Sequence, residues 1–326
     1  MEPFSAEQVA TDFLFKQACQ VPHHPVVMPA WENAGIEVLL RRDDLIDPLQ
    51  SGNKFYKLFF NLHNARLCGA KKLLSFGGAH SNHLYTLAQV GKRNGFTTEA
   101  WVRGERPAKL SPTLTDAERM GMRLRFISRS YYRALTTGET ILSTPADTYI
   151  IPEGGDNDAG RQGAQMITRA IDHHLGDSYQ AICVAVGTGG TLAGIASALS
   201  KNRYALGISV LKSSAGTISR CAQALPKQAH WRLLWGFHDG GYGKKPSAEA
   251  QRFWQEFECR NDIIIEPVYT LKLLRAIARL AESGYWPRGT RLVAVHSGGL
   301  QGRRYYAQKL NHSTTQTLRE NNYAAV

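Results

Sequence analysis

Cysteine is scarce in this sequence, and its arrangement excludes two kinds of cysteine-stabilised fold. The chain has five cysteines: Cys19, Cys68, Cys183, Cys221 and Cys259. They are widely scattered, odd in number and never spaced as C-x-x-C, which indicates neither a disulfide framework nor a cysteine-rich zinc site. We expect reduced, mostly buried thiols. Since the H-E-x-x-H pattern is missing as well, the sequence predicts no metal site.

Long apolar runs are also missing. No stretch approaches the roughly 20 residues that cross a bilayer, and the N-terminus lacks a basic segment followed by an apolar core. We therefore expect a cytoplasmic protein without a membrane partner.

The sequence also lacks the motifs of nucleic-acid binding, although its formal net charge is +12. Its basic residues are spread along the chain, with a mild concentration at Arg288, Arg291, Arg303 and Arg304. No zinc finger or RNA-binding aromatic signature accompanies them. The charge therefore indicates a solvated basic surface, without a nucleic-acid partner, that attracts small anions.

Strand and helix patterns alternate from residue 36 almost to the end. Strands are expected at 36–41, 72–76, 98–103, 123–127, 148–151, 181–186, 205–211, 231–237 and 291–295. Helices are expected from Phe55 onward and at 80–93, 114–120, 159–174, 192–199, 217–224, 248–258 and 271–283. Because single helices separate most of the strands, the pattern predicts mostly parallel sheets with right-handed crossovers. We predict an α/β fold of two doubly wound domains, with a ligand in the cleft between them.

One lysine stands at a junction between strand and helix. Lys54 lies in the run Ser51-Gly52-Asn53-Lys54-Phe55-Tyr56-Lys57, just before an apolar helical pattern. Gly52 lets both the backbone and the Lys54 ammonium approach a ligand. The alternative is an ordinary lysine in the first turn of a surface helix, with its amine in water.

Gly187-Thr188-Gly189-Gly190-Thr191 is a glycine-rich turn that follows a continuous apolar strand and opens a helix. Backbone amides and threonine hydroxyls at a helix N-terminus form a phosphate site. The spacing matches neither the P-loop nor the dinucleotide fingerprint, so it gives little support to a nucleotide ligand. The alternative is a tight turn that needs glycine only for its backbone.

A second glycine-rich turn runs from Gly77 to His83. Ser81 and Asn82 stand where the next helix begins, and Ser81 would be a good N-cap. Taken together, a lysine able to form an imine and a phosphate cradle indicate a pyridoxal phosphate enzyme.

In their order and spacing, these three elements resemble the tryptophan synthase β-type (fold type II) family of pyridoxal phosphate enzymes. The most similar branch contains D-cysteine desulfhydrase and 1-aminocyclopropane-1-carboxylate (ACC) deaminase. The similarity runs from about residue 30 to about 302, and it includes Gly240 to Gly243, Glu266 to Thr270 and His296 to Gly299. It implies pyridoxal 5′-phosphate as cofactor, a small amino acid as substrate and a homodimer. We expect a larger cofactor-binding domain of residues 1–53 plus 160–326, with a smaller α/β domain of residues 54–159 inserted in it.

The resemblance also implies roles for individual residues. Lys54 would carry the cofactor as an imine, Asn82 would contact the pyridine 3′-oxygen, and Ser81 would act on substrate protons. The phosphate would be held by Gly187, Thr188, Gly189, Gly190 and Thr191. Tyr242 and Tyr269 match two active-site tyrosines, although the sequence alone would favour simple packing beside a helix for both.

Thr270 and Ser297 separate the members of this branch. ACC deaminases resemble one another in having glutamate and leucine at these positions, and the two hydroxyl residues resemble the desulfhydrase pattern instead. Ser297 could hydrogen-bond the pyridine nitrogen without holding a proton on it, which makes the ring a weaker electron sink. Expelling a thiolate needs less electron withdrawal than opening a cyclopropane.

The sequence therefore predicts a pyridoxal-phosphate-dependent lyase or deaminase. The reaction most in keeping with it is α,β-elimination of the D-cysteine desulfhydrase type, giving pyruvate, ammonia and sulfide. ACC deamination to 2-oxobutyrate and ammonia is the first alternative, beside serine or threonine dehydration and β-replacement. A non-catalytic pyridoxal phosphate-binding protein is the second.

Overall fold

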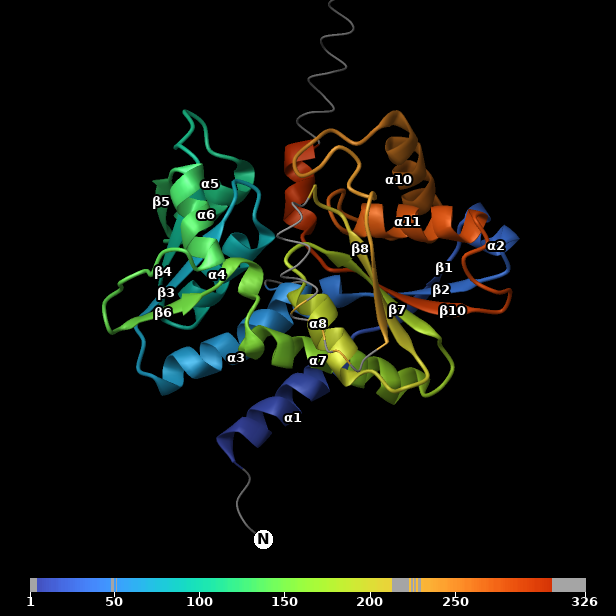
Figure 1. Ribbon diagram of the computed structural model, residues 1–326, viewed down its shortest axis with the longest axis horizontal. Coiled ribbons are helices and arrows are strands. Elements are labelled where there is room, and N and C mark those ends of the chain that lie inside the picture. Colours follow the sequence, from blue (N-terminus) through green and yellow to red (C-terminus); the bar gives the residue numbers. More distant parts are fainter. Residues whose placement is uncertain are drawn as a thin grey trace, which may run out of the picture.

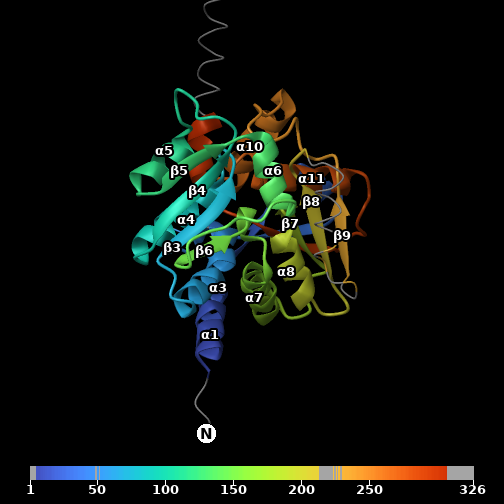
Figure 2. The same ribbon diagram turned by 60° about the vertical axis from the view of Figure 1, so that its left-hand side comes forward.

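The computed structural model describes residues 5–47, 50, 52–212, 223, 225, 227 and 230–306. Its strands form two sheets that lie side by side, with helices against both (Figures 1 and 2). The larger sheet has the order β1-β2-β10-β7-β8-β9 and the smaller has the order β5-β4-β3-β6. All pairs are parallel except β1 with β2. This confirms the predicted α/β fold.

The larger sheet consists of β1 (His23–Val26), β2 (Glu37–Arg41), β10 (Arg291–Val295), β7 (Ala181–Val186), β8 (Tyr204–Ser209) and β9 (Trp231–Leu234). One face packs on α2 (Pro29–Asn33), α10 (Ala248–Asn261) and α11 (Thr270–Glu282). The other packs on α1 (Ala6–Cys19), α7 (Asp158–Leu175) and α8 (Gly190–Ala198). Because both faces are covered, every residue of β7 is buried, which explains its unbroken apolar sequence.

The smaller sheet consists of β5 (Arg123–Ile127), β4 (Thr97–Arg103), β3 (Lys72–Gly77) and β6 (Thr148–Ile151). One face packs on α4 (Asn82–Arg93) and α5 (Pro112–Arg119). On the other face, Tyr132 of α6 (Arg129–Thr137) joins a small cluster with Phe76 and Trp101. The carboxyl ends of these strands face the larger sheet across the cavity described below.

Helix α3 (Asn53–Leu67) packs against both sheets. Phe55, Tyr56 and Phe60 belong to the core under the larger sheet, and Leu58 and Leu62 belong to the core of the smaller one. The first turn of α3, which carries Lys54, therefore lies at the junction of the two sheets. The domain boundaries proposed at 53/54 and 159/160 stay a prediction.

The sequence patterns missed three α-helices and one strand, namely α1, α2, α6 and β1. Helix α6 escaped notice because its sequence is polar and Tyr132 is its one buried residue. The helix expected at 217–224 lies outside the described residues except for Gln223.

The expectation of mostly buried thiols was wrong. Cys183 is buried and Cys19 is half-buried, but Cys68, at the C-terminal end of α3, and Cys259, on the solvent side of α10, are exposed. Cys221 lies outside the described residues.

The basic residues concentrated near the C-terminus are largely paired. Arg291 contacts Glu37 at 2.6 Å, Arg303 pairs with Glu258, and Arg304 pairs with Asp116. In the part of the chain that the structure describes, no helix combines the length and apolarity of a membrane span, and no three or more metal-ligating side chains form a cluster.

Candidate active site

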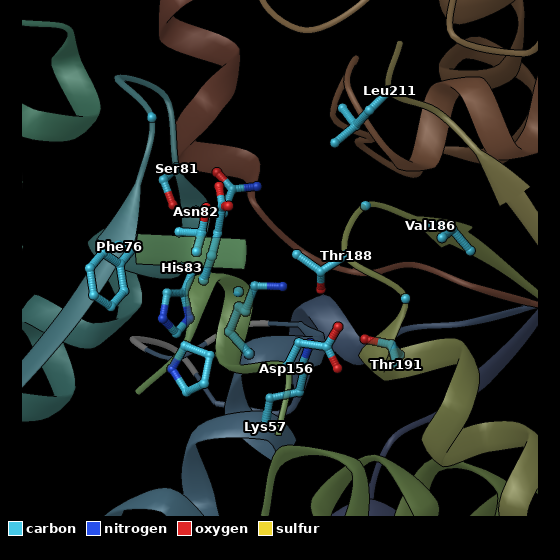
Figure 3. A pocket seen from close by; sticks show the side chains of 18 of the residues that line it. Lys57, Phe76, Ser81, Asn82, His83, Asp156, Val186, Thr188, Thr191 and Leu211 are labelled. Atoms are coloured by element: carbon cyan, nitrogen blue, oxygen red, sulfur yellow. The ribbon is translucent and has the colours of Figure 1, made fainter. Parts of the chain in front are cut away.

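A cavity of about 930 Å³ lies between the two sheets, at the carboxyl ends of β3, β6, β7 and β8. Its wall contains nearly every site residue that the sequence predicted. They are Lys54, Ser81, Asn82, Gly187, Thr188, Gly189, Thr191, Tyr242, Tyr269 and Ser297. Gly190 packs directly behind this wall. Residues far apart in the sequence thus meet in one place (Figure 3).

Lys54 is positioned by a close approach of two backbones. Gly52, the N-cap of α3, has φ of 79°, and a methyl group on it would lie 1.9 Å from the Ser297 carbonyl oxygen. The Asn53 N–H donates to that oxygen at 3.3 Å. Only glycine fits here, for conformational and for steric reasons. This contact fixes the start of α3 against the turn after β10.

The surroundings of the Lys54 amine lower its pKa and so favour its neutral form. Burial and the positive charge of Lys57 together lower the pKa of Lys54 to about 7, against the opposing effect of Asp156. Asn53 Oδ1 accepts a hydrogen bond from the amine at 3.3 Å. A large neutral fraction near pH 7 is what a nucleophile requires.

Lys57 is a functional candidate that the sequence reasoning passed over. Its side chain is 1% exposed, and it stands one helical turn after Lys54, on the same face of α3. A methyl group on Gly190 would lie 2.7 Å from Lys57 Nζ and 2.6 Å from Asp156 Oδ1. Ammonium and carboxylate thus both lie against Gly190 at the start of α8. The i, i+3 spacing of the two lysines was the available signal.

The turn from Gly187 to Thr191 opens α8, and Gly189 adopts a left-handed conformation with φ of 104°. Asn53 Nδ2 donates to Thr191 Oγ1 at 2.8 Å, which joins this turn to the start of α3. The N–H groups of the helix start, the Thr191 hydroxyl and Lys57 converge at one end of the cavity. This combination provides the donors and the positive charge that a phosphate requires.

Ser81 has two functions in the geometry of its turn. Its Oγ accepts a hydrogen bond from the Leu84 N–H at 3.3 Å, which confirms the predicted N-cap of α4. Because Oγ acts there as acceptor, its own O–H remains able to donate into the cavity that it lines. A methyl group on Gly77 would lie 2.7 Å from Ser81 Oγ, so glycine is needed beside it.

Asn82 and His83 follow Ser81 on α4. Asn82 Oδ1 accepts from Gln301 Nε2 at 2.9 Å, which leaves the Asn82 amide N–H groups as donors. His83 is buried, and its Nε2 lies 2.8 Å from Ser75 Oγ. Burial and the charges of Lys54 and Lys57 hold the pKa of His83 well below its usual range, so its imidazole is neutral.

Tyr242 and Tyr269 bring phenol groups to the cavity. The Tyr242 hydroxyl donates to the His80 carbonyl, and burial raises the pKa of both tyrosines, which keeps the phenols protonated. The carboxylate of Glu266 accepts the backbone N–H groups of Val268, Tyr269 and Thr270. Glu266 therefore fixes the loop that presents Tyr269.

Ser297 lines the cavity, whereas Thr270 does not belong to the described part of its wall. The adjacent His296 Nδ1 accepts from the Gly298 N–H at 3.2 Å, and His296 Nε2 donates to the Ile264 carbonyl at 2.9 Å. These two bonds fix the loop that carries Ser297. Of the two positions singled out in the sequence, Ser297 is thus the one that lines the cavity.

The family model of the pyridoxal-phosphate dependent enzymes matches residues 26–298 of the chain. The chain belongs to this family. Its members use pyridoxal phosphate, so the cofactor predicted from Lys54 and the glycine-rich turns is confirmed, and so is a pyridoxal-phosphate-dependent lyase or deaminase.

Several relatives resemble this pyridoxal-phosphate-dependent enzyme along most of its length. A Pyrococcus horikoshii protein whose name proposes 1-aminocyclopropane-1-carboxylate deaminase activity is 28% identical over 292 residues, 85% of this chain and 88% of its own. The mitochondrial bifunctional D-cysteine desulfhydrase/1-aminocyclopropane-1-carboxylate deaminase of Arabidopsis thaliana is 27% identical over 323 residues, 86% of this chain and 76% of its own. The crystal structure of an ACC deaminase homologue superposes with a TM-score of 0.75 and 25% identity, covering 92% of this chain and 98% of that one.

The cavity of this pyridoxal-phosphate-dependent enzyme fits its cofactor. A buried amine with a lowered pKa and the donors at the start of α8 both belong to this cavity. In the same wall, the Asn82 amide and the Ser297 hydroxyl offer the polar groups that a pyridine ring requires.

Proposed function

We propose that the enzyme catalyses α,β-elimination on a small amino acid with a β-leaving group, of which D-cysteine is the model. With cysteine, one water is consumed, the Cα–H and Cβ–S bonds break, and pyruvate, ammonia and hydrogen sulfide form. The observation that carries the proposal is Ser297, a hydroxyl residue in the cavity wall on a loop fixed by His296. When bound, the cofactor withdraws electrons from the substrate Cα and so makes its proton acidic.

Lys54 would bind the cofactor covalently through Nζ and, once displaced by the substrate amine, would move the Cα proton. Its pKa of about 7 allows both roles near neutral pH, because a neutral amine is the nucleophile and the base. Ser81 would take part in the same proton transfer through its O–H, which its capping bond leaves available.

The chain would hold the cofactor through groups on three elements. Lys57 and the N–H groups at the start of α8 would bind the phosphate, and Asn82 would donate to the pyridine 3′-oxygen. Tyr269 would donate a hydrogen bond to the leaving thiolate, because its raised pKa keeps the phenol protonated. The Tyr242 hydroxyl donates to the His80 carbonyl, so its oxygen can act only as an acceptor. A water that donates to this oxygen and to the substrate carboxylate would orient the carboxylate.

ACC deamination is the second candidate, because the names of the relatives support it as well. In that reaction, ACC and one water give 2-oxobutyrate and ammonia. A carrier that binds the cofactor without turnover agrees less well with the arrangement, since it has no use for Lys54, Ser81 and two phenols around one cavity. A homodimer and a cytoplasmic location stay predictions.

Product analysis distinguishes these functions. The enzyme, loaded with pyridoxal phosphate, would be incubated with D-cysteine, L-cysteine, ACC and L-serine. We expect pyruvate and sulfide from D-cysteine, with kcat/KM well above that for ACC. The Lys54→Ala variant should lose turnover together with the absorbance of the lysine-bound cofactor, and Lys92→Ala, on the exposed side of α4, should lose neither. A loaded protein that converts none of these amino acids would refute the proposal in favour of a carrier.

A further inference from the structure

We propose that Arg103 selects substrates that carry a second anionic group, a carboxylate, beyond the β-carbon. This inference rests on the proposed elimination and specifies its substrate class. The side chain of Arg103 lines the cavity, and neither the family match nor the sequence motifs gave it a role.

Arg103 is placed at the cavity by the parallel pairing of β3 and β4. It is the last residue of β4, and Gly77, at the end of β3, pairs with the residue before it. A methyl group on Gly78 would lie 3.6 Å from Arg103 Nη2. The guanidinium therefore stands beside the turn that leads to Ser81.

The guanidinium of Arg103 is held on an aromatic platform. Its Cζ lies 5.6 Å from the ring centre of Tyr132, a residue of α6 that is 3% exposed. The Tyr132 ring in turn packs edge-on against Phe76, with 6.2 Å between the ring centres. Stacking of this kind restricts the side chain before any ligand arrives, so less entropy is lost when it binds an anion.

The cavity wall holds acidic as well as basic groups. Burial and the nearby carboxylate of Glu153, which also lines the cavity, raise the pKa of Tyr132. Arg161 contacts Asp156 at 3.1 Å and Asp158 at 3.3 Å, and Lys57 and Asp156 both lie against the start of α8. By contrast, no carboxylate in the described part of the chain forms an ion pair with Arg103. Arg103 is exposed, so its guanidinium lies at the rim of the cavity, where a planar cation matches a carboxylate in a bidentate geometry.

The size of the cavity agrees with a distal role for Arg103. Its volume of about 930 Å³ lies near the upper end of the range of roughly 300–1,000 Å³ for sites that enclose drug-sized ligands. The cofactor and the substrate share this volume, which suits a substrate longer than cysteine.

The test compares two substrates that differ only in distal charge. S-carboxymethyl-cysteine and its neutral amide, S-carbamoylmethyl-cysteine, would be given to the enzyme as both enantiomers. Elimination consumes one water and releases pyruvate, ammonia and the corresponding thiol. We expect kcat/KM for the carboxylate to exceed that for the amide at least roughly tenfold, as a charge-assisted contact allows.

Three variants test whether Arg103 causes the preference for the carboxylate substrate. Arg103→Ala should abolish it through a higher KM for the carboxylate alone, and Arg103→Lys should keep part of it. Arg125→Ala is the matched control, because Arg125 stacks on Trp101 at 4.5 Å in the same sheet but is outside the cavity wall. It should leave both substrates unchanged.

Two outcomes would overturn the proposal. One is a wild-type enzyme that does not prefer the carboxylate. The other is an equal loss for both substrates in Arg103→Ala, which would mean that Arg103 holds the α-carboxylate or the fold. Spectroscopic titration of the loaded enzyme with both ligands gives their Kd values without turnover. If no substrate reacts, the proposed elimination fails, while the ratio of these Kd values still decides the role of Arg103.

Discussion

At the scale of single residues, the reactivity of this site depends on charges that surround one amine. Lys54 has a lowered pKa because it is buried and because Lys57 stands one helical turn away, while Asp156 partly restores it. Lys57 and Asp156 in turn approach each other at Gly190, where no side chain fits. The two neighbours of Lys54 therefore act on it with opposite signs.

Because Lys57 and Asp156 have opposite effects on the Lys54 pKa, removing either charge should shift the pH midpoint of cofactor loading in opposite directions. The amine reacts with pyridoxal phosphate only when neutral, so the loading rate should rise with pH and reach half its maximum near the Lys54 pKa of about 7. Lys57→Met removes a positive charge and should move that midpoint up by roughly one pH unit. Asp156→Asn removes a negative charge and should move it down. Stopped-flow absorbance of the lysine-bound cofactor at saturating concentration measures both, and equal midpoints in all three proteins would contradict the account.

A second prediction at this scale separates the two functions of Ser81. Ser81→Ala should cost about 0.5–2 kcal/mol of stability through the lost cap and lower kcat by roughly 10²- to 10⁴-fold through the lost proton donor. Ser247→Ala is the control, because Ser247 caps α10 in the same way, with the Ala250 N–H at 3.2 Å. It should lose stability alone, as followed by urea unfolding and by pyruvate formation. If both variants kept full activity, Ser81 would be a cap and nothing more.

At the scale of elements, the cavity exists because turns after parallel strands approach each other without side chains between them. Gly52 meets the backbone of Ser297, and Gly77 meets the Ser81 hydroxyl. The start of α3 is held by the turn after β10, although more than two hundred residues separate them in the chain. The position of Lys54 is thus set by a backbone contact more than by its own helix.

Gly52→Ala should therefore damage both the fold and the site. It combines a left-handed φ of 79° with a methyl group 1.9 Å from Ser297 O, so we expect a loss of roughly 3 kcal/mol or more. Gly69→Ala is the matched control, because Gly69 has φ of 68° and open space around it. It should cost only about 1–2 kcal/mol. Urea unfolding and retention of the cofactor on gel filtration measure both, and equal losses would show that the contact with Ser297 is unimportant.

At the scale of the whole molecule, α3 and α7 connect the two sheets. Gly163 of α7 lies so close to α3 that a methyl group on it would stand 2.0 Å from the Tyr56 carbonyl oxygen. Phe55 and Leu58, on neighbouring positions of α3, pack into different cores. Separation of these two helices would therefore disturb the packing of both sheets and the cavity between them.

Gly163→Ala should force α3 away from α7. Because the clash is with backbone, we expect a loss of about 1–3 kcal/mol or more in the free energy of unfolding, together with weaker retention of pyridoxal phosphate. Arg169→Ala changes an exposed position of the same helix and should cost little. Thermal unfolding with and without the cofactor measures the effect. Unchanged stability of Gly163→Ala would mean that the two helices are not tightly coupled.

Several features of the site followed from local patterns. Gly187 to Thr191 after the apolar run of β7, and Ser81 at the start of α4, were recognisable because strand ends, glycines and caps are encoded within a few residues. Other features of the site were not predicted from the sequence. Asp156 and Arg103 carry no local signature, and the Glu266 carboxylate acts on a loop whose fold the sequence does not reveal.

By itself, the sequence determined the alternation of strands and helices, the glycine-rich turns and the lysine at the start of α3, because each depends on neighbouring residues and their periodicity. Only the tertiary structure decided what surrounds them. It lowers the pKa of Lys54 through burial and Lys57, places Ser297 in the cavity but not Thr270, and brings Arg103 beside Gly78. Burial and the distances between charges arise when the two sheets pack together, so they depend on contacts between residues far apart in the chain.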